Sequence, residues 1–278
     1  MMWLGYGLAI LVAIFLVLST WRQMDHRADQ AAWNMLSGTS EDEFQVFDHE
    51  MIRDLPEPAQ RYFTYTIAKG TVLHRVVQIE MNGEMGLGTI DAPNYKPMKA
   101  TQILAPPYGL VWKLKSGAIS GSDGATPETS WTRFWLFNFI PVVRAGSADQ
   151  RRSAFGRVVA EASFWAPASL LPNKFVKWEA LSNDSARAIV AYGEFTQAVD
   201  IEVDEEGAPK RVIIQRWSNE NPEKEFREQP FGGELSQFQN FAGYRLPTRV
   251  TGGNHIGTDA YFPFFKANVT SISFPLSR

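Results

Sequence analysis

Two patterns of hydrophobic and polar residues divide this chain. Residues 2–18 form an almost uninterrupted apolar run, which as a helix would rise about 25 Å, close to the thickness of a bilayer core. From residue 72 onward, apolar and polar residues alternate with a period of two, which is typical of strands with one buried face. We therefore expect a transmembrane anchor over residues 1–21, a polar stalk over 22–47 and a folded domain over 48–278.

The apolar run predicts a single-pass protein of the cell membrane. Trp3, Tyr6 and Trp21 lie near its ends, as residues of an interfacial aromatic belt do. A cleaved signal peptide is the alternative, but no Lys or Arg precedes the run and no small-x-small cleavage motif follows it. Arg22 and Arg27 follow the span, and the positive-inside rule then favours a cytoplasmic domain.

The domain is expected to be α+β and mostly β. About ten alternating runs read as strands, and the turn residues Gly207 and Pro209 join two of them in a hairpin. Helices are predicted over residues 59–68 and 148–163. One antiparallel sheet of this size must curl. The sequence therefore predicts a half-barrel whose helices cover the concave face.

Composition excludes several classes of function. The net charge is −3, and no basic domain supports nucleic-acid binding. The chain has no Cys, so disulfides, thiolate nucleophiles and Cys-ligated metals are excluded. It also has no Gly-x-Gly-x-x-Gly, phosphate-binding loop, Gly-x-Ser-x-Gly or His-Glu-x-x-His motif. We expect no cofactor and no metal.

A charge pair is predicted on the second helix. Arg157 and Glu161 are four residues apart and share one helical face, and their neighbours are apolar nearly all round. The pair is interpreted first as an internal salt bridge that fixes the helix against the sheet. Alternatively, Arg157 binds an anionic headgroup, or Glu161 is a general acid or base.

A second candidate group lies near the C-terminus. His255 is flanked by glycines and lies four residues before Asp259. The two could form an acid–base pair, although a histidine bonded to its neighbouring loop is the simpler interpretation. Two side chains do not make a metal site. Phe264 and Phe265 are expected either in the core or in the wall of an apolar cavity.

The spacing of several motifs resembles that of an uncharacterised bacterial domain family. These motifs are Arg157-x-x-x-Glu161, Pro167-x-x-Leu170-Leu171-Pro172, Trp178, Arg216-Trp217, Gly232-Gly233 and Gly243-Tyr-Arg-Leu-Pro247-Thr. Over roughly residues 50–275 the chain is similar to DUF6544, a family of unknown function. The resemblance implies a fold like the curled half-barrel of the periplasmic lipoprotein and lipid carriers. That analogy favours an extracytoplasmic domain, against the two arginines, and it does not imply a function.

The resulting hypothesis is a membrane-anchored carrier or binding domain for an apolar or amphiphilic ligand, such as a lipid. The membrane and a hydrophobic small molecule are the expected partners. The cavity wall would contain Trp112, Trp131, Trp135, Phe264 and Phe265, and Arg157 or His255 would meet the headgroup. One alternative is a hydrolase or isomerase that uses Glu161, His255 and Asp259. Another is a structural envelope module with an exposed apolar patch.

Overall fold

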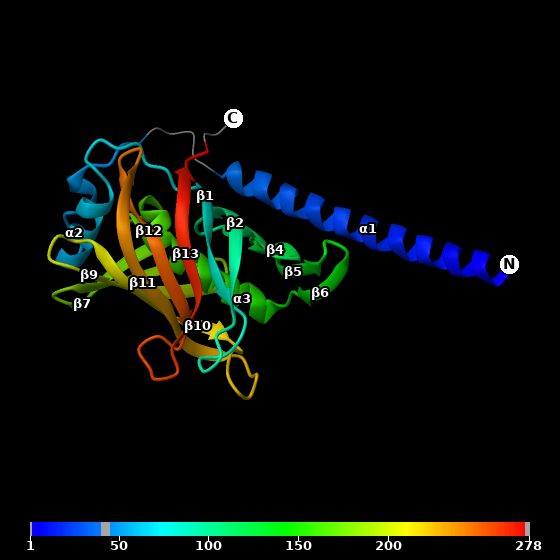
Figure 1. Ribbon diagram of the computed structural model, residues 1–278. Coiled ribbons are helices and arrows are strands. Elements are labelled where there is room, and N and C mark those ends of the chain that lie inside the picture. The colour runs from blue at the N-terminus through cyan, green and yellow to red at the C-terminus, as the bar shows by residue number, and fades with distance from the viewer. Residues whose placement is uncertain (1, 40–44, 276–278) are drawn as a thin grey trace.

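Thirteen strands form one curled antiparallel sheet in the described part of the chain (Figure 1). The structure is a computed structural model and describes residues 2–39 and 45–275, with side chains from residue 6 onward. The strands are β1 Val77–Gly86, β2 Tyr95–Ala105, β3 Gly109–Ser116, β4 Ile119–Ala125, β5 Ser130–Leu136, β6 Ile140–Ala145, β7 Val176–Ser182, β8 Ser185–Tyr192, β9 Phe195–Val203, β10 Pro209–Ser218, β11 Arg227–Phe241, β12 Tyr244–Asn254 and β13 Phe262–Ser273. The expected mostly-β fold is confirmed.

The order of the strands explains why a helix fills the space inside the curled sheet. It runs β6-β5-β4-β3-β2-β1-β13-β12-β11-β10-β9-β8-β7, so two meanders join where β1 pairs with β13. The two edge strands, β6 and β7, are consecutive along the chain. The segment that connects them holds helix α3 (Ala148–Trp165) and the short helix η2 (Pro167–Leu170). Because this connection must run from one edge to the other, α3 lies inside the curl of the sheet.

Local sequence signals set the ends of the helices. The Ser147 hydroxyl caps α3 by accepting from the Gln150 backbone N–H at 3.1 Å, and Pro167 disfavours further helix beyond Ala166. Helix α2 (Glu57–Thr66) begins with a proline in its first turn. It packs against α3, where the buried Tyr62 hydroxyl donates to the Ser163 carbonyl at 2.7 Å. Both predicted helices are present, and they cover the concave face.

The two faces of the sheet belong to different clusters of buried residues. The concave face forms the main core with α2, α3 and η2, and includes Leu110, Trp112 and Leu114 of β3. The intervening Val111 faces the other way and packs with Leu36 of α1 (Met2–Ser37). Helix α1 therefore covers part of the convex face with its C-terminal half. Its N-terminal half extends away from the domain (Figure 1).

Residues 22–37, which were expected to lie in a polar stalk, continue the apolar helix without a break. Three of their polar side chains, Arg22, Asp25 and Asp29, are buried against the sheet, whereas those of residues 23, 26, 27, 30 and 34 are exposed. The Asp25 carboxylate accepts from Trp135 Nε1 at 2.9 Å and from Arg144 Nη2 at 3.0 Å. Residues 40–44 of the expected stalk lie outside the described residues.

One alternating run is interrupted by a turn. Residues 131–139 carry aromatic side chains at alternate positions, as a single strand would, but β5 ends at Leu136 and a turn follows. Phe137 and Asn138 adopt the left-handed conformation there, with φ of 51° and 59°. Thus only Trp131, Arg133 and Trp135 share a face, and the chain returns as β6.

Candidate functional site

A cavity of about 820 Å³ lies on the concave side of the sheet beside α3. Its walls are mostly aromatic and aliphatic, and come from α3 and from both meanders of the sheet. Connecting loops at residues 87–88, 146–147 and 219–226 line one end of it. Apolar side chains in the wall are Met85, Trp112, Phe164, Trp165, Phe226, Phe231, Leu235, Val250, Phe262, Phe264 and Phe265.

Two paired glycines leave part of the cavity wall without side chains. Gly233 of β11 and Gly252 of β12 are paired across the two strands, and both line the cavity. At these positions a half-buried strand would ordinarily place a large apolar residue. The paired glycines instead leave a stretch of wall that consists of backbone alone, which widens the space next to α3.

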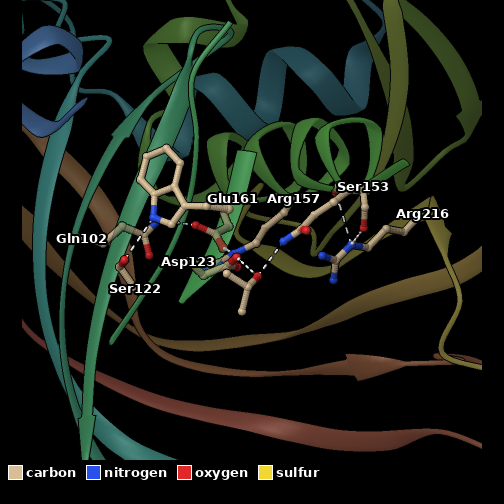
Figure 2. Close-up of polar contacts among 10 residues, drawn as sticks. Gln102, Ser122, Asp123, Ser153, Arg157, Glu161 and Arg216 are labelled. Atoms are coloured by element: carbon tan, nitrogen blue, oxygen red, sulfur yellow. Dashed lines mark hydrogen bonds and ion pairs between the residues drawn. The ribbon is translucent and has the colours of Figure 1, made fainter. Parts of the chain in front are cut away.

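A row of polar side chains crosses the concave face where α3 meets the sheet. The strand register places Gln102, Trp112, Asp123 and Thr132 at successive partner positions on β2, β3, β4 and β5. Each of them contacts α3. Gln102 donates to Glu161 (Figure 2), and Gln150 donates to the Thr132 hydroxyl at 2.6 Å.

Arg157 lies at the centre of this row. Its Nε donates to Glu161 and its Nη1 donates to Asp123 at 2.7 Å, while its guanidinium carbon is 5.2 Å from the centre of the Trp112 ring. Burial would by itself lower the pKa of Arg157, but the two carboxylates outweigh it and raise that pKa. Arg157 and Glu161 thus form the expected internal salt bridge. Asp123 is a second carboxylate partner of Arg157.

Arg216 is the second arginine of the cavity and has a different environment. Its Nε donates to the Ser153 carbonyl at 3.3 Å and to the Ser153 hydroxyl at 3.1 Å (Figure 2). The Phe231 ring lies 4.7 Å from its guanidinium carbon. Burial, and then the nearby charge of Arg157, lower the pKa of Arg216 to about 10, so this guanidinium remains protonated at neutral pH.

Neither terminal nitrogen of Arg216 donates to an acceptor within residues 2–39 and 45–275. Over the same ranges, no carboxylate lies within 4 Å of Arg216. Arg216 was not among the candidate site residues. The signal that could have identified it is its position in β10. Arg216 alternates there with Val212, Ile214 and Ser218, which are all buried.

The structure brings some of the expected cavity residues together and separates others. Trp112, Arg157, Glu161, Phe264 and Phe265 line the cavity. Trp131 and Trp135 lie on the opposite face, because α1 covers the convex side of β5: Trp131 packs with Leu36, and Trp135 donates to Asp25. Alternation along β5 indicates that these tryptophans share a face, but it does not identify which face is concave.

His255 and Asp259 lie in the loop between β12 and β13 and do not line the cavity. The His255 ring bonds through Nε2 to the Glu220 carbonyl at 2.9 Å, and its backbone N–H donates to Pro230. In the described ranges no hydrogen bond or ion pair joins His255, Asp259 and Glu161. Nor do these ranges contain a group of three His, Cys, Asp or Glu residues placed to hold a metal ion.

The fold and the cavity define a curled antiparallel half-barrel domain whose concave face holds a helix and a mostly apolar space. Residues 45–267 match DUF6544, a family of unknown function, and the chain belongs to this family. A search of curated proteins gave no match.

Two solved structures are similar to this chain at low identity. One is a LolA superfamily protein from Nitrosomonas europaea, with 10% identity, a TM-score of 0.41, and coverage of 78% of this chain and 91% of that chain. The other is described as an outer membrane lipoprotein-sorting protein domain from Vibrio parahaemolyticus, with 9% identity, a TM-score of 0.37, and coverage of 81% and 91%.

Proposed function

We propose that this protein binds an apolar or amphiphilic ligand, such as a lipid or a lipid-linked group, in the cavity beside α3. The observation that carries the proposal is the cavity itself. Its volume of about 820 Å³ falls in the range of small-molecule sites, which are mostly apolar with a few polar groups. A structural module with a filled interior would leave no such space.

We further propose that α1 anchors the domain in a membrane. Among the described residues, one helix, Tyr6–Ser37, is long and apolar enough to cross a bilayer. The side chains of residues 8, 10–12 and 14–17 are largely exposed to solvent, although all are large and apolar. The same helix continues into residues that pack on the sheet, and this continuity favours a retained anchor over a cleaved signal peptide.

The test uses the full chain, purified from membranes in a mild detergent. Bound lipids are released by solvent and quantified by mass spectrometry. Ala154 lies on α3 and lines the cavity, so Ala154→Phe is expected to reduce the bound ligand severalfold by occupying its space. Ala191→Phe, on an exposed position of β8, is the matched control and is expected to retain it.

Lipids that surround the anchor are common to all three proteins, so only ligand held in the cavity responds to Ala154→Phe. Equal lipid content in the wild type and in both variants would contradict the proposal. Circular dichroism and a cooperative melting transition show whether Ala154→Phe remains folded.

A further inference from the structure

Resting on the proposed function, we propose that the ligand carries an acidic oxygen group, a phosphate or a carboxylate, and that Arg216 binds this group. The inference starts from unused hydrogen-bonding capacity. A guanidinium has five N–H donors in a fixed fork that matches such groups bidentately. In Arg216, which lines the cavity, only the Nε donor is used within the described residues.

The other charged groups of the cavity have partners of their own, and the exposed Glu220 in its wall lies 3.6 Å from Lys224. Asp123 accepts from Thr132 and from Arg157, and Glu161 accepts from Arg157 and from Gln102. Every carboxylate oxygen of this pair of acids therefore has a donor. These two acids leave no carboxylate oxygen free, whereas Arg216 has a free donor fork, and so this part of the site favours an acceptor group on the ligand.

The summed charge of the cavity limits how strongly it can prefer an acidic ligand over a neutral one. Arg157 and Arg216 together balance Asp123 and Glu161, and Glu220 adds a further negative charge to the wall, so the lining carries no net positive charge. Recognition must come from the directed N–H groups of Arg216, strengthened by the apolar wall and by the Phe231 ring. We expect about a tenfold preference for an acidic ligand over a neutral one, which corresponds to about 1.4 kcal/mol.

The experiment compares three probes on the full-length protein in detergent by isothermal titration calorimetry. They are a short-chain phosphatidic acid, a diacylglycerol with the same acyl chains, and inorganic phosphate. The wild type is expected to bind the phosphatidic acid about tenfold more tightly than the diacylglycerol. Arg216→Met is expected to lose this preference and retain diacylglycerol binding. Arg211→Met, on the same strand but outside the cavity, should retain the preference.

The outcomes separate the two proposals. If the wild type binds both lipids equally, or if Arg216→Met keeps the preference, the role of Arg216 is overturned and the cavity function stands. If neither lipid binds, the proposed function itself fails. If inorganic phosphate alone binds as tightly as the phosphatidic acid, the site is one for free phosphate and the lipid assignment is overturned.

A different observation carries a second inference, on the hairpin of β5 and β6. Four large apolar side chains are exposed there: Phe137 at 72%, Ile140 at 48%, Val142 at 47% and Val143 at 44%. The hairpin lies against the proposed anchor, because the Phe139 ring stacks on Phe15 of α1 at 5.3 Å. We infer that the turn of this hairpin enters the interfacial region of the bilayer that α1 crosses.

The contact with Phe15 shows how far the hairpin reaches along the proposed anchor. Phe15 belongs to the apolar run, and Arg22 follows about 10 Å further along the helix axis. Arg22 Nε donates to Asn138 of the same turn at 2.7 Å. The hairpin therefore extends from the polar end of the anchor into the level of its apolar residues. Phe137 and Ile140 would contact acyl chains there instead of water.

The chain has no Cys, so single cysteines can be labelled without other changes. Full-length Phe137→Cys, carrying an environment-sensitive fluorophore, is reconstituted into vesicles of phosphatidylcholine and phosphatidylglycerol. We expect a blue-shifted emission that a doxyl-labelled lipid quenches at least twofold. Leu181→Cys on the far edge strand β7, also an exposed apolar position, is expected to report water.

Vesicle flotation distinguishes the two ways in which this result could fail. A protein that floats with the vesicles but shows a water-exposed label at position 137 would overturn the hairpin inference alone. A protein that does not float would overturn the anchor on which the inference rests.

Discussion

Arg157 of α3 and Asp123 of β4 form an ion pair of 2.7 Å between the helix inside the half-barrel and the sheet around it. The same guanidinium also holds Glu161 one helical turn away. All three side chains are largely shielded from water, with exposed fractions of 14%, 29% and 12%. This cluster attaches α3 to the concave face together with the hydrogen bonds from Gln150 to Thr132 and from Arg216 to Ser153.

Removal of the central arginine is expected to destabilise the domain substantially. Arg157→Met leaves two shielded carboxylates without their cation, and such a loss costs about 3 kcal/mol. Urea unfolding of the full chain in detergent, followed by tryptophan fluorescence, measures the change. The matched control is Arg187→Met, which breaks the more exposed pair with Asp200 and is expected to cost less than about 1 kcal/mol. Equal losses for the two variants would contradict this assignment.

The attachment of α1 to the convex face depends on Asp25. This carboxylate accepts from Trp135 and Arg144, so Asp25→Leu leaves a buried indole N–H and an arginine without their acceptor. We expect hydrogen exchange across residues 22–37 to accelerate at least tenfold, because the local opening free energy falls by more than about 1.4 kcal/mol. Gln30→Leu, on an exposed position of the same helix, should leave exchange nearly unchanged. Unaltered exchange in Asp25→Leu would show that apolar contacts alone hold the helix.

The sequence predicted the strands of the sheet, but it did not predict which residues cover each of the two faces. Alternation identifies residues that share a face, as it did for Trp131 and Trp135. It does not show which face a separate helix covers. The polar residues of α1, Asp25 among them, were predicted to lie in a polar stalk that precedes the domain. Their partners, Arg133 and Arg144, lie more than 100 positions away, and no local pattern predicts such a pairing.

The candidate site could be predicted only in part, because only some of its contacts are local in the sequence. The spacing of Arg157 and Glu161 is local, and it predicted their pair. Asp123 and Gln102 join that pair through the register of three strands, β2, β3 and β4, which the sequence does not specify. Arg216 differs from an exposed arginine only by the alternation of β10 around it, and its free N–H groups become apparent only once the cavity is known.

The predicted hairpin between β9 and β10 provides a further test of packing. Gly207 of its turn has φ of 93°, and an added Cβ would lie 2.3 Å from the Arg61 carbonyl oxygen of α2. Gly207→Ala is expected to cost about 3 kcal/mol, from the left-handed backbone and from this collision. Gly193→Ala has a similar backbone, with φ of 59°, but no atom within 4 Å, and should cost about 1 kcal/mol. Thermal or urea unfolding of both variants compares the two costs, and equal losses would show that α2 moves aside.

Stability is expected to depend on pH through His74. The His74 ring stacks on Phe274 with 4.8 Å between their centres, and burial lowers the pKa of His74 below its ordinary value of 6.5. The unfolded chain therefore binds a proton more readily than the folded one. The contribution of His74 to stability is present above pH 6.5 and is lost as the pH falls toward its folded pKa. The unfolding free energy of the wild type should thus fall more steeply between pH 7.5 and 5 than that of His74→Gln. Subtracting the two curves removes the carboxylates that titrate in both proteins, and parallel curves would contradict the role of His74.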